Sequence, residues 1–173
     1  MFIKPTKKAK PIFNHLPEVS INSNEEINPL FTWHASYATM DRKKIVFIVN
    51  ASTYAPIVLY DINAQKKKNI QQEIYDGMFR LFDDLFLPKE TFDNYMKAAG
   101  EIVLLENGPY NRRVSGATVN MISMGSNFSN LINPSFTYQA VFSQKVGDIP
   151  FQFHDKKNPF PLKRFTEEME AFK

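Results

Sequence analysis

Residues 31–60, FTWHASYATMDRKKIVFIVNASTYAPIVLY, contain the pattern that decides the fold of this chain. The stretch opens with apolar side chains at every second position, the period of a half-buried strand: Phe31, Trp33, Ala35 and Tyr37. Residues 44–50 form a continuous β-branched and aromatic run, typical of a strand covered on both faces. Residues 56–60 resume as a third strand. Because short connections join the three, with a turn at 40–42, we expect an antiparallel meander.

Helical spacing of apolar residues replaces this alternation further along the chain. Caps and prolines delimit the predicted helices, at 69–87, 88–100, from about 111 onwards, and at 162–172. Short apolar stretches predict further strands at 2–3 and 101–105. We therefore predict an α+β fold. Its sheet is expected to be mostly antiparallel, a meander of three strands plus further strands, with three to four helices packed on it.

The length of 173 residues fits one domain. We predict a single globular domain over residues 1–173, in which residues 126–173 carry the weakest pattern. Residues 136–142 alternate like a strand, but Pro134 equally opens a helix, so both interpretations stay open.

Two polar segments are predicted to lack regular structure. Residues 22–28 are the best candidate for disorder, and Asn107-Gly108-Pro109 predicts a turn.

The composition excludes several protein classes. The chain has no cysteine, so no disulfide framework is possible. Residues 1–10 contain lysines but no apolar stretch of the kind found in signal peptides. The longest apolar runs are far too short to span a bilayer. We therefore expect a soluble, cytoplasmic protein with no membrane partner.

The charges are unevenly distributed along the chain, although the net charge is only +3. Basic clusters occur at residues 4–10, 42–44 and 66–68, whereas residues 70–106 hold eight acids against three basic residues, a net charge of −5. Basic clusters favour anionic partners, nucleic acid among them, but short lysine runs are also common in solvated turns.

The sequence Asn111-Arg112-Arg113 at a predicted helix start is the strongest candidate for an anion site. Arginines in the first helical turn oppose the macrodipole, and a helix start offers free backbone N–H groups. A phosphate or a carboxylate would resolve this conflict. The alternative is that both arginines pair with the acidic helices at 73–93. Lys7 and Arg42 complete the predicted anion-binding set.

Histidine is the residue type examined for catalysis. His34 lies on the strand face opposite Trp33 and is the candidate general base. The three histidines share no metal-ligand spacing, and the chain has no zinc pattern or nucleotide-binding loop, so we predict no metal and no cofactor. Trp33 and Tyr37 can stack on bases, or belong to the core.

Three boxes in order suggest a family. They are Ile3-x-Pro5-Thr6-Lys7-Lys8, then Trp33-His34-Ala35 with Asp41-Arg42-Lys43-Lys44 and Asn50-x-x-Thr53, and then Asn111-Arg112-Arg113-Val114-x-Gly116-x-x-x-Asn120. Over about residues 1–125 the chain resembles an uncharacterised bacterial domain family of unknown function, found alone or beside plasmid-type ORF-3-like domains. Arg113 stands where that family has a smaller residue.

The resemblance implies no activity, but it marks positions to examine: Thr6, Lys7, Trp33, Arg42, Asn50, Thr53, Arg112, Gly116 and Asn120. The polar members Thr6, Asn50, Thr53 and Asn120 either form one cluster or satisfy local turns and caps.

Three functional hypotheses follow, and the oligomeric state stays open. The leading one is a non-enzymatic binding module for an anionic partner, nucleic acid or a small anion. The second is a small metal-independent hydrolase or nuclease, which requires His34, Arg42 and Arg112 to line one pocket. The third is a protein–protein interaction domain that uses the acidic helices.

Overall fold

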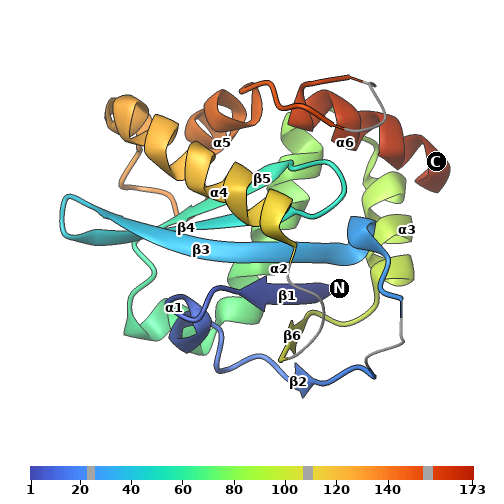
Figure 1. Ribbon diagram of the computed structural model, residues 1–173, viewed down its shortest axis with the longest axis horizontal. Helices are drawn as coiled ribbons and strands as arrows, with labels where there is room; N and C mark the ends of the chain where they lie inside the picture. The colour runs from blue at the N-terminus through green and yellow to red at the C-terminus, as the bar shows by residue number, and fades with distance from the viewer. Residues whose placement is uncertain (23–25, 107–110, 154–157) are drawn as a thin grey trace.

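A mixed sheet of six strands organises the computed structural model, with helices on both of its faces (Figure 1). The structure describes all residues except 23–25, 107–110 and 154–157. The strands are β1 (Phe2–Pro5), β2 (Glu18–Val19), β3 (Thr32–Met40), β4 (Lys43–Asn50), β5 (Pro56–Tyr60) and β6 (Val103–Leu105). Their order across the sheet is β2-β6-β1-β3-β4-β5.

The predicted antiparallel meander is confirmed in β3, β4 and β5. β3 pairs antiparallel with β4, and β4 with β5. Asp41 and Arg42 form the two-residue turn between β3 and β4, with φ values of 49° and 63°. Two consecutive positive φ angles are the geometry of a tight hairpin turn whose twist matches the flanking strands.

The prediction that the sheet is mostly antiparallel is wrong. β1 pairs parallel with β3 and with β6, and β2 pairs parallel with β6, so three of the five pairings in the described chain are parallel. β1 and β6 have only four and three residues. Alternation within so short a strand fixes which face a side chain occupies, but not the direction of its neighbour.

The described chain has six α-helices rather than three to four: α1 (Ala64–Lys68), α2 (Ile70–Asp84), α3 (Lys89–Ala99), α4 (Arg112–Gly125), α5 (Ala140–Gly147) and α6 (Pro161–Met169). Short 3₁₀ segments are η1 (Lys10–Ile12), η2 (Pro29–Phe31), η3 (Ser126–Leu131) and η4 (Glu170–Phe172). The helix α1 was not predicted because its sequence, AQKKK, has no apolar stripe. In agreement, none of its five residues is buried. Neither interpretation of the segment after Pro134 is confirmed: Tyr138 forms a single bridge to Leu59 of β5, and the helix α5 begins at Ala140 rather than at Pro134.

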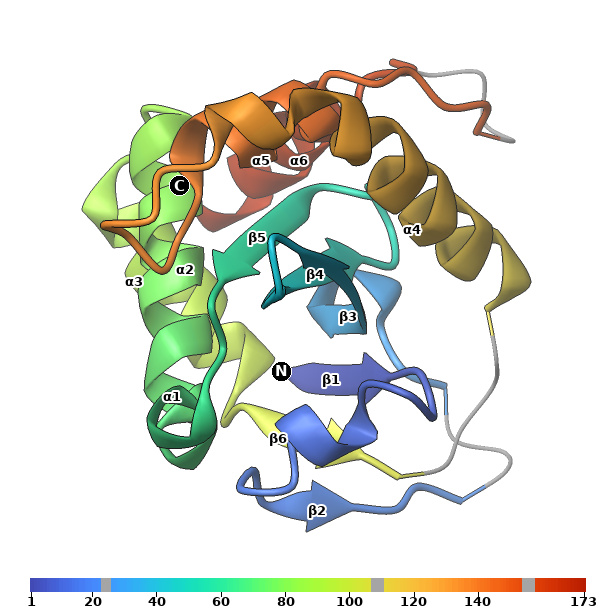
Figure 2. The same ribbon diagram turned by 90° about the vertical axis from the view of Figure 1, so that its left-hand side faces the viewer.

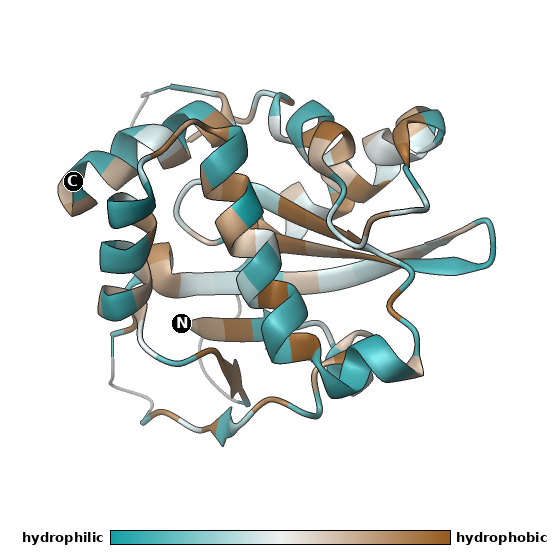
Figure 3. Ribbon diagram, turned by 180° about the vertical axis from the view of Figure 1, so that it is seen from behind, coloured by the Kyte–Doolittle hydropathy of each residue, from teal (hydrophilic) through white to brown (hydrophobic). Residues whose placement is uncertain are grey.

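The helices divide between the two faces of the sheet (Figure 2). α2, α3 and α6 pack on one face, against a core that includes Trp33, Val46 and Ile57. α4 and α5 pack on the other face, against Phe47 and Val58. The strand β4 contributes buried residues to both cores, as predicted. Seen from behind, hydrophobic residues concentrate in the strands between the helices, and the tip of the β3–β4 hairpin is hydrophilic (Figure 3).

The interpretation of Trp33 as a core residue is confirmed. Its side chain has no exposed surface, and its indole N–H donates to the Tyr95 hydroxyl at 3.1 Å. The Phe165 ring from α6 lies edge-on to the Trp33 ring, with centroids 5.8 Å apart. The terminal helix thus packs on the same core as the first strands. None of the described helices is long and apolar enough to cross a membrane.

Two predicted features lie wholly or partly outside the described residues. The turn at 107–109 is outside them, and so is the middle of the segment 22–28.

Candidate functional site

Basic residues from three separate segments meet at one side of the sheet. The ring of Tyr37 on β3 connects two of them: the Lys8 ammonium lies 4.3 Å from the ring centroid and the Lys44 ammonium 5.4 Å from it. The third segment is α1, where Lys67 lies close enough to Lys44 for the Lys44 charge to affect the protonation of Lys67. Burial and the Lys44 charge lower the pKa of Lys67. Clusters that are far apart in the sequence are therefore neighbours in space.

We call this region the basic surface and define it as Lys8, Arg42, Lys43, Lys44, Lys66 and Lys67. Arg42, Lys43, Lys44 and Lys67 line an open depression of about 350 Å³ together with Asp61. Asp61 forms an ion pair with Lys43, with a nitrogen–oxygen distance of 3.1 Å. The segments that form the surface also contain Asp41 and Asp61, so six basic and two acidic residues give a local net charge of +4.

The remaining basic residues of these clusters lie differently. Lys7 is exposed and precedes Lys8 in the chain. Lys68 lines another depression, between α2 and α3. Tyr37 is half-buried against the core, with two ammonium groups at its ring, so it is poorly placed to stack on a base. The basic surface therefore offers charge for phosphate contacts rather than a stacking platform.

The predicted anion site at the start of α4 lies apart from the basic surface. The side chain of Asn111 caps the helix and accepts hydrogen bonds from the backbone N–H groups of Arg113 at 3.1 Å and Val114 at 3.3 Å. Two of the donors that an anion would use are thus already engaged. The Arg113 charge acts on Tyr54, where it partly offsets the effect of burial, which raises the pKa of that phenol.

The alternative pairing of these arginines with the acidic helices is not observed. Neither Arg112 nor Arg113 makes an ion pair with an acid in the part of the chain that the structure describes. The physical reason is the placement of the helices: α4 lies on one face of the sheet, and α2 and α3 lie on the other (Figure 2).

His34 lines a small pocket between the sheet and α4. The pocket has a volume of about 90 Å³ and is formed by Lys4, Pro5, Thr6, His34, Ala35, Ser36, Ser115, Thr118 and Val119. Lys4 lies directly beside His34 in the parallel register of β1 and β3. Burial and the Lys4 charge lower the pKa of His34 to about 4.

The structure does not bring the three proposed catalytic residues together. Arg42 lines the depression of the basic surface, and neither Arg42 nor Arg112 lines the pocket of His34. The hydrolase hypothesis therefore lacks the convergence that it requires. Of the other histidines, His15 is exposed and His154 lies outside the described residues.

Three of the four polar residues marked by the family resemblance, Thr6, Asn50 and Thr53, form local hydrogen bonds, whereas Asn120 is exposed on α4. The Asn50 side-chain oxygen accepts from the backbone N–H of Ser52 and Thr53, both at 3.0 Å, and its amide donates to the Leu30 carbonyl. The Thr6 hydroxyl accepts from the Ala9 N–H at 3.3 Å. These bonds hold the loop after β4 and the start of the segment after β1 in place.

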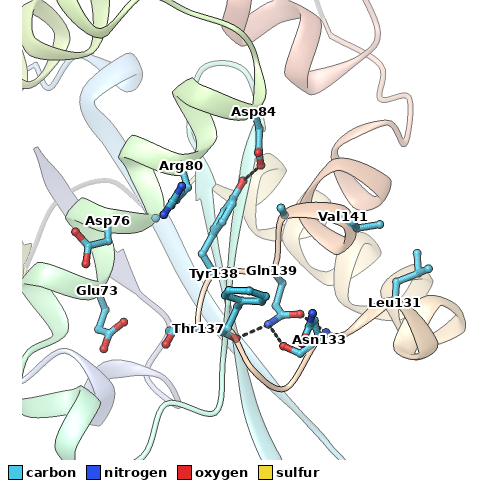
Figure 4. Close-up of a pocket in the computed structure, with 13 residues that line it drawn as sticks. Glu73, Asp76, Arg80, Asp84, Leu131, Asn133, Thr137, Tyr138, Gln139 and Val141 are labelled. Carbon is cyan, nitrogen blue, oxygen red and sulfur yellow. Dashed lines mark hydrogen bonds between the residues drawn. The ribbon is translucent and has the colours of Figure 1, made fainter.

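A larger cleft lies between α2 and the segment before α5 (Figure 4). Its volume is about 470 Å³, and one wall carries Glu73, Asp76, Arg80 and Asp84 of α2. We call it the acidic cleft. Leu131, Phe136 and Val141 contribute apolar surface to the other wall. Because acids dominate one wall, this cleft is a poor site for an anion.

Hydrogen bonds fix the floor and the far wall of the acidic cleft (Figure 4). The Tyr138 hydroxyl donates to Asp84 at 2.8 Å, and the Gln139 amide donates to the carbonyls of Asn133 and Phe136 at 2.8 and 2.6 Å. Burial raises the pKa of Asp84, although the bond from Tyr138 lowers it. Burial also raises the pKa of Tyr138.

Sequence reasoning missed the acidic cleft. Of the adjacent residues Asp83 and Asp84, only Asp84 lines the cleft. One signal was available: Gly77, Arg80 and Asp84 recur at three- and four-residue spacing and so share one helix face. Tyr138, which donates to Asp84, is 54 residues further along the chain, and no local sequence pattern predicts that the two segments form one cleft.

The described residues contain no group of three or more histidine, aspartate or glutamate side chains that could hold a metal ion. The chain belongs to a family described as a domain of unknown function (DUF6933), whose model matches residues 2–162. The family match therefore extends well past residue 125, the limit suggested by the three boxes. No curated protein and no solved structure matches the chain.

Proposed function

We propose that this member of the DUF6933 family is a non-enzymatic binding module for nucleic acid, which it holds through the basic surface. The observation that carries the proposal is the convergence of three segments: Lys8 and Lys44 lie at the ring of Tyr37, and Lys67 lies beside Lys44. Neighbouring like charges repel one another. A polyanion on the surface offsets that repulsion and releases counterions, which favours binding.

The shape and charge of the basic surface favour a phosphate backbone. Its depression is open to solvent and lies between the hairpin turn and α1, so an extended chain can lie across it. Lysines supply point charges rather than the paired donors that read base edges. We therefore expect binding that depends on phosphate and salt and shows little sequence preference.

The first experiment measures the anisotropy of labelled mixed-sequence RNA and DNA at low and near-physiological salt. We expect dissociation constants of about 1–100 μM that weaken steeply as salt rises. Absence of binding to both nucleic acids at low salt would overturn the proposal.

A matched pair of variants locates the site. Lys44→Gln combined with Lys67→Gln is expected to weaken binding by about tenfold or more. Lys97→Gln combined with Lys163→Gln removes the same charge from two exposed positions outside the basic surface and is expected to leave affinity within about twofold. Equal losses in the two variants would show that only net charge matters and would contradict the assigned surface.

A further inference from the structure

We infer that the pocket between β1, β3 and α4 binds a small phosphate-type oxyanion through Lys4, His34, Ser36 and Ser115. This site shares no residue with the basic surface, so it is independent of the proposed nucleic-acid function. We call it the β1–α4 pocket.

The sheet register brings the two nitrogen-bearing side chains together. Ile3, Trp33 and Ala35 belong to the core on the α2 face. Alternation along β1 and β3 therefore directs Lys4 and His34 to the α4 face, where the two residues are register partners. Ser36 follows on the same face of β3, and Ser115 from the first turns of α4 closes the pocket.

The polar lining is unusual for a sheet face under a helix. The neighbouring strand β4 presents Ile45, Phe47 and Val49 to this side of the sheet, and all three are fully buried. Polar side chains in such a position are costly unless they gain partners. A ligand that accepts hydrogen bonds from them explains why β3 carries His34 and Ser36 here.

The donor chemistry selects the charge of the ligand. Lys4, His34 and the two serines all donate to oxygen, and none of the described lining residues carries a carboxylate. The Thr118 hydroxyl already donates to the Val114 carbonyl at 2.8 Å, so it is not counted as a ligand donor. Donors that reach the pocket from both the sheet and the helix suit a tetrahedral oxyanion.

The size of the pocket limits the ligand. A volume of about 90 Å³ exceeds the 10–15 Å³ or so that one water requires, and holds one oxyanion or the terminal phosphate of a larger molecule. A base or a sugar does not fit inside it. The exposed side chain of Val119 lines the pocket as well, so an ester group has a route toward solvent.

Anion binding is coupled to the protonation of His34. Burial and the Lys4 charge hold the pKa of His34 at about 4, and Lys4 is the charged neighbour that acts on it. An anion between the two side chains stabilises the imidazolium and raises that pKa. Binding of phosphate near pH 6 is therefore accompanied by proton uptake at His34.

The experiment follows the His34 ring resonances by NMR in the full chain while inorganic phosphate is added at constant ionic strength. His34→Gln assigns the signals. The expected result is a saturable shift with an increase of at least about one unit in the His34 pKa. Addition of glycerol 3-phosphate in a parallel titration distinguishes the free anion from a phosphate ester, and tighter binding of either one supports the site.

Variants and controls make the result decisive. Lys4→Gln is expected to weaken phosphate binding at least tenfold, whereas Lys97→Gln, at an exposed position outside the pocket, leaves it unchanged. Ser115→Ala provides a second test if Lys4→Gln does not fold, with an expected loss of threefold or more. A His34 pKa that stays unchanged at saturating phosphate would overturn the assignment. So would phosphate binding that is equally strong in the wild type and in the Lys4→Gln and Ser115→Ala variants.

Discussion

In the acidic cleft Asp84 accepts a hydrogen bond from Tyr138, whereas on the basic surface Lys44 lies beside Lys67. Other acids of these helices show the same internal pairing: Asp76, which also lines the cleft, accepts from Gln72 at 2.8 Å, and Asp93 pairs with Lys89 at 2.6 Å. On the basic surface the ion pair between Lys43 and Asp61 is accompanied by several cations that face other cations or a tyrosine ring.

This difference separates charges that stabilise the fold from charges that favour a partner. Acids with donors inside the chain have little to gain from an external cation, because much of their interaction is already made. Crowded cations gain from an external anion, since it relieves repulsion as well as adding attraction. A related effect occurs inside the molecule, where Lys4 lies beside His34 and, together with burial, disfavours the charged form of that imidazole.

The largest expected effect reverses the charge of the basic surface. Lys44→Glu combined with Lys67→Glu is expected to weaken nucleic-acid binding on the order of 100-fold, because two phosphate contacts become repulsive. Neutralisation of two acids in the acidic cleft, by Glu73→Gln combined with Asp76→Asn, is expected to alter affinity by about twofold or less. Fluorescence anisotropy at fixed salt measures both, and equal effects would remove the distinction between the two regions.

The second prediction concerns the pH dependence of stability that arises from His34 beside Lys4. His34 has a pKa of about 4 in the folded chain against about 6.5 when unfolded, so the unfolded state binds its proton first. Stability is complete above pH 6.5 and falls as the pH decreases toward 4, by about 3 kcal/mol at most. Urea denaturation at several pH values measures this loss.

Two histidine variants test the assignment of that pH window. His34→Gln is expected to flatten stability between pH 6.5 and 4, because the group that takes up the proton is absent. His15→Gln changes an exposed histidine and is expected to retain the wild-type dependence. A wild-type profile in His34→Gln would assign the dependence to other groups.

A smaller effect is expected in the acidic cleft. Tyr138→Phe removes the donor to Asp84 and is expected to cost about 1 kcal/mol of the free energy of unfolding. The pKa of Asp84 should rise further above its usual value, because the lost hydrogen bond lowers it. Tyr75→Phe on the exposed side of α2 is the control, and equal losses in the two variants would contradict internal pairing as the source of stability.

The smallest predicted effect is a stabilising one. Lys67→Gln relieves the repulsion with Lys44 and is expected to raise the free energy of unfolding by roughly a few tenths of a kcal/mol at low salt. The gain should vanish near 1 M salt, where charges are screened within about 3 Å. Lys97→Gln is the control at an exposed position outside the basic surface, and it should leave the free energy of unfolding unchanged. A destabilised Lys67→Gln protein would show that the cations do not repel one another.

Local patterns predicted those parts of the fold that depend on local physics. The hairpin around Asp41 and the doubly covered strand β4 were correctly predicted, since period and turn chemistry determine both. The helix start near residue 111 was also predicted correctly. The parallel partners of β1 were missed, because the direction of pairing depends on long connections that carry no periodic signal.

The candidate sites divide in the same way. The segments of the basic surface were each visible as lysine runs, but only the fold brings Lys8, Lys44 and Lys67 together. The pairing of Lys4 with His34 depends on the register of parallel strands, which sequence spacing does not encode. Nucleic-acid and anion binding stay predictions, as does the assignment of Lys7, Arg42, Arg112 and Arg113 to an anion site.

The most direct measurement is the salt dependence of nucleic-acid affinity in the wild type and in a triple variant with Lys8→Gln, Lys44→Gln and Lys67→Gln. A contact with one phosphate contributes about 0.7–0.9 to the slope of log K against log salt. The basic surface therefore predicts a slope that is shallower by about 2–3 in the triple variant. An identical slope in both proteins would show that these lysines do not contact phosphate and would contradict the proposed function.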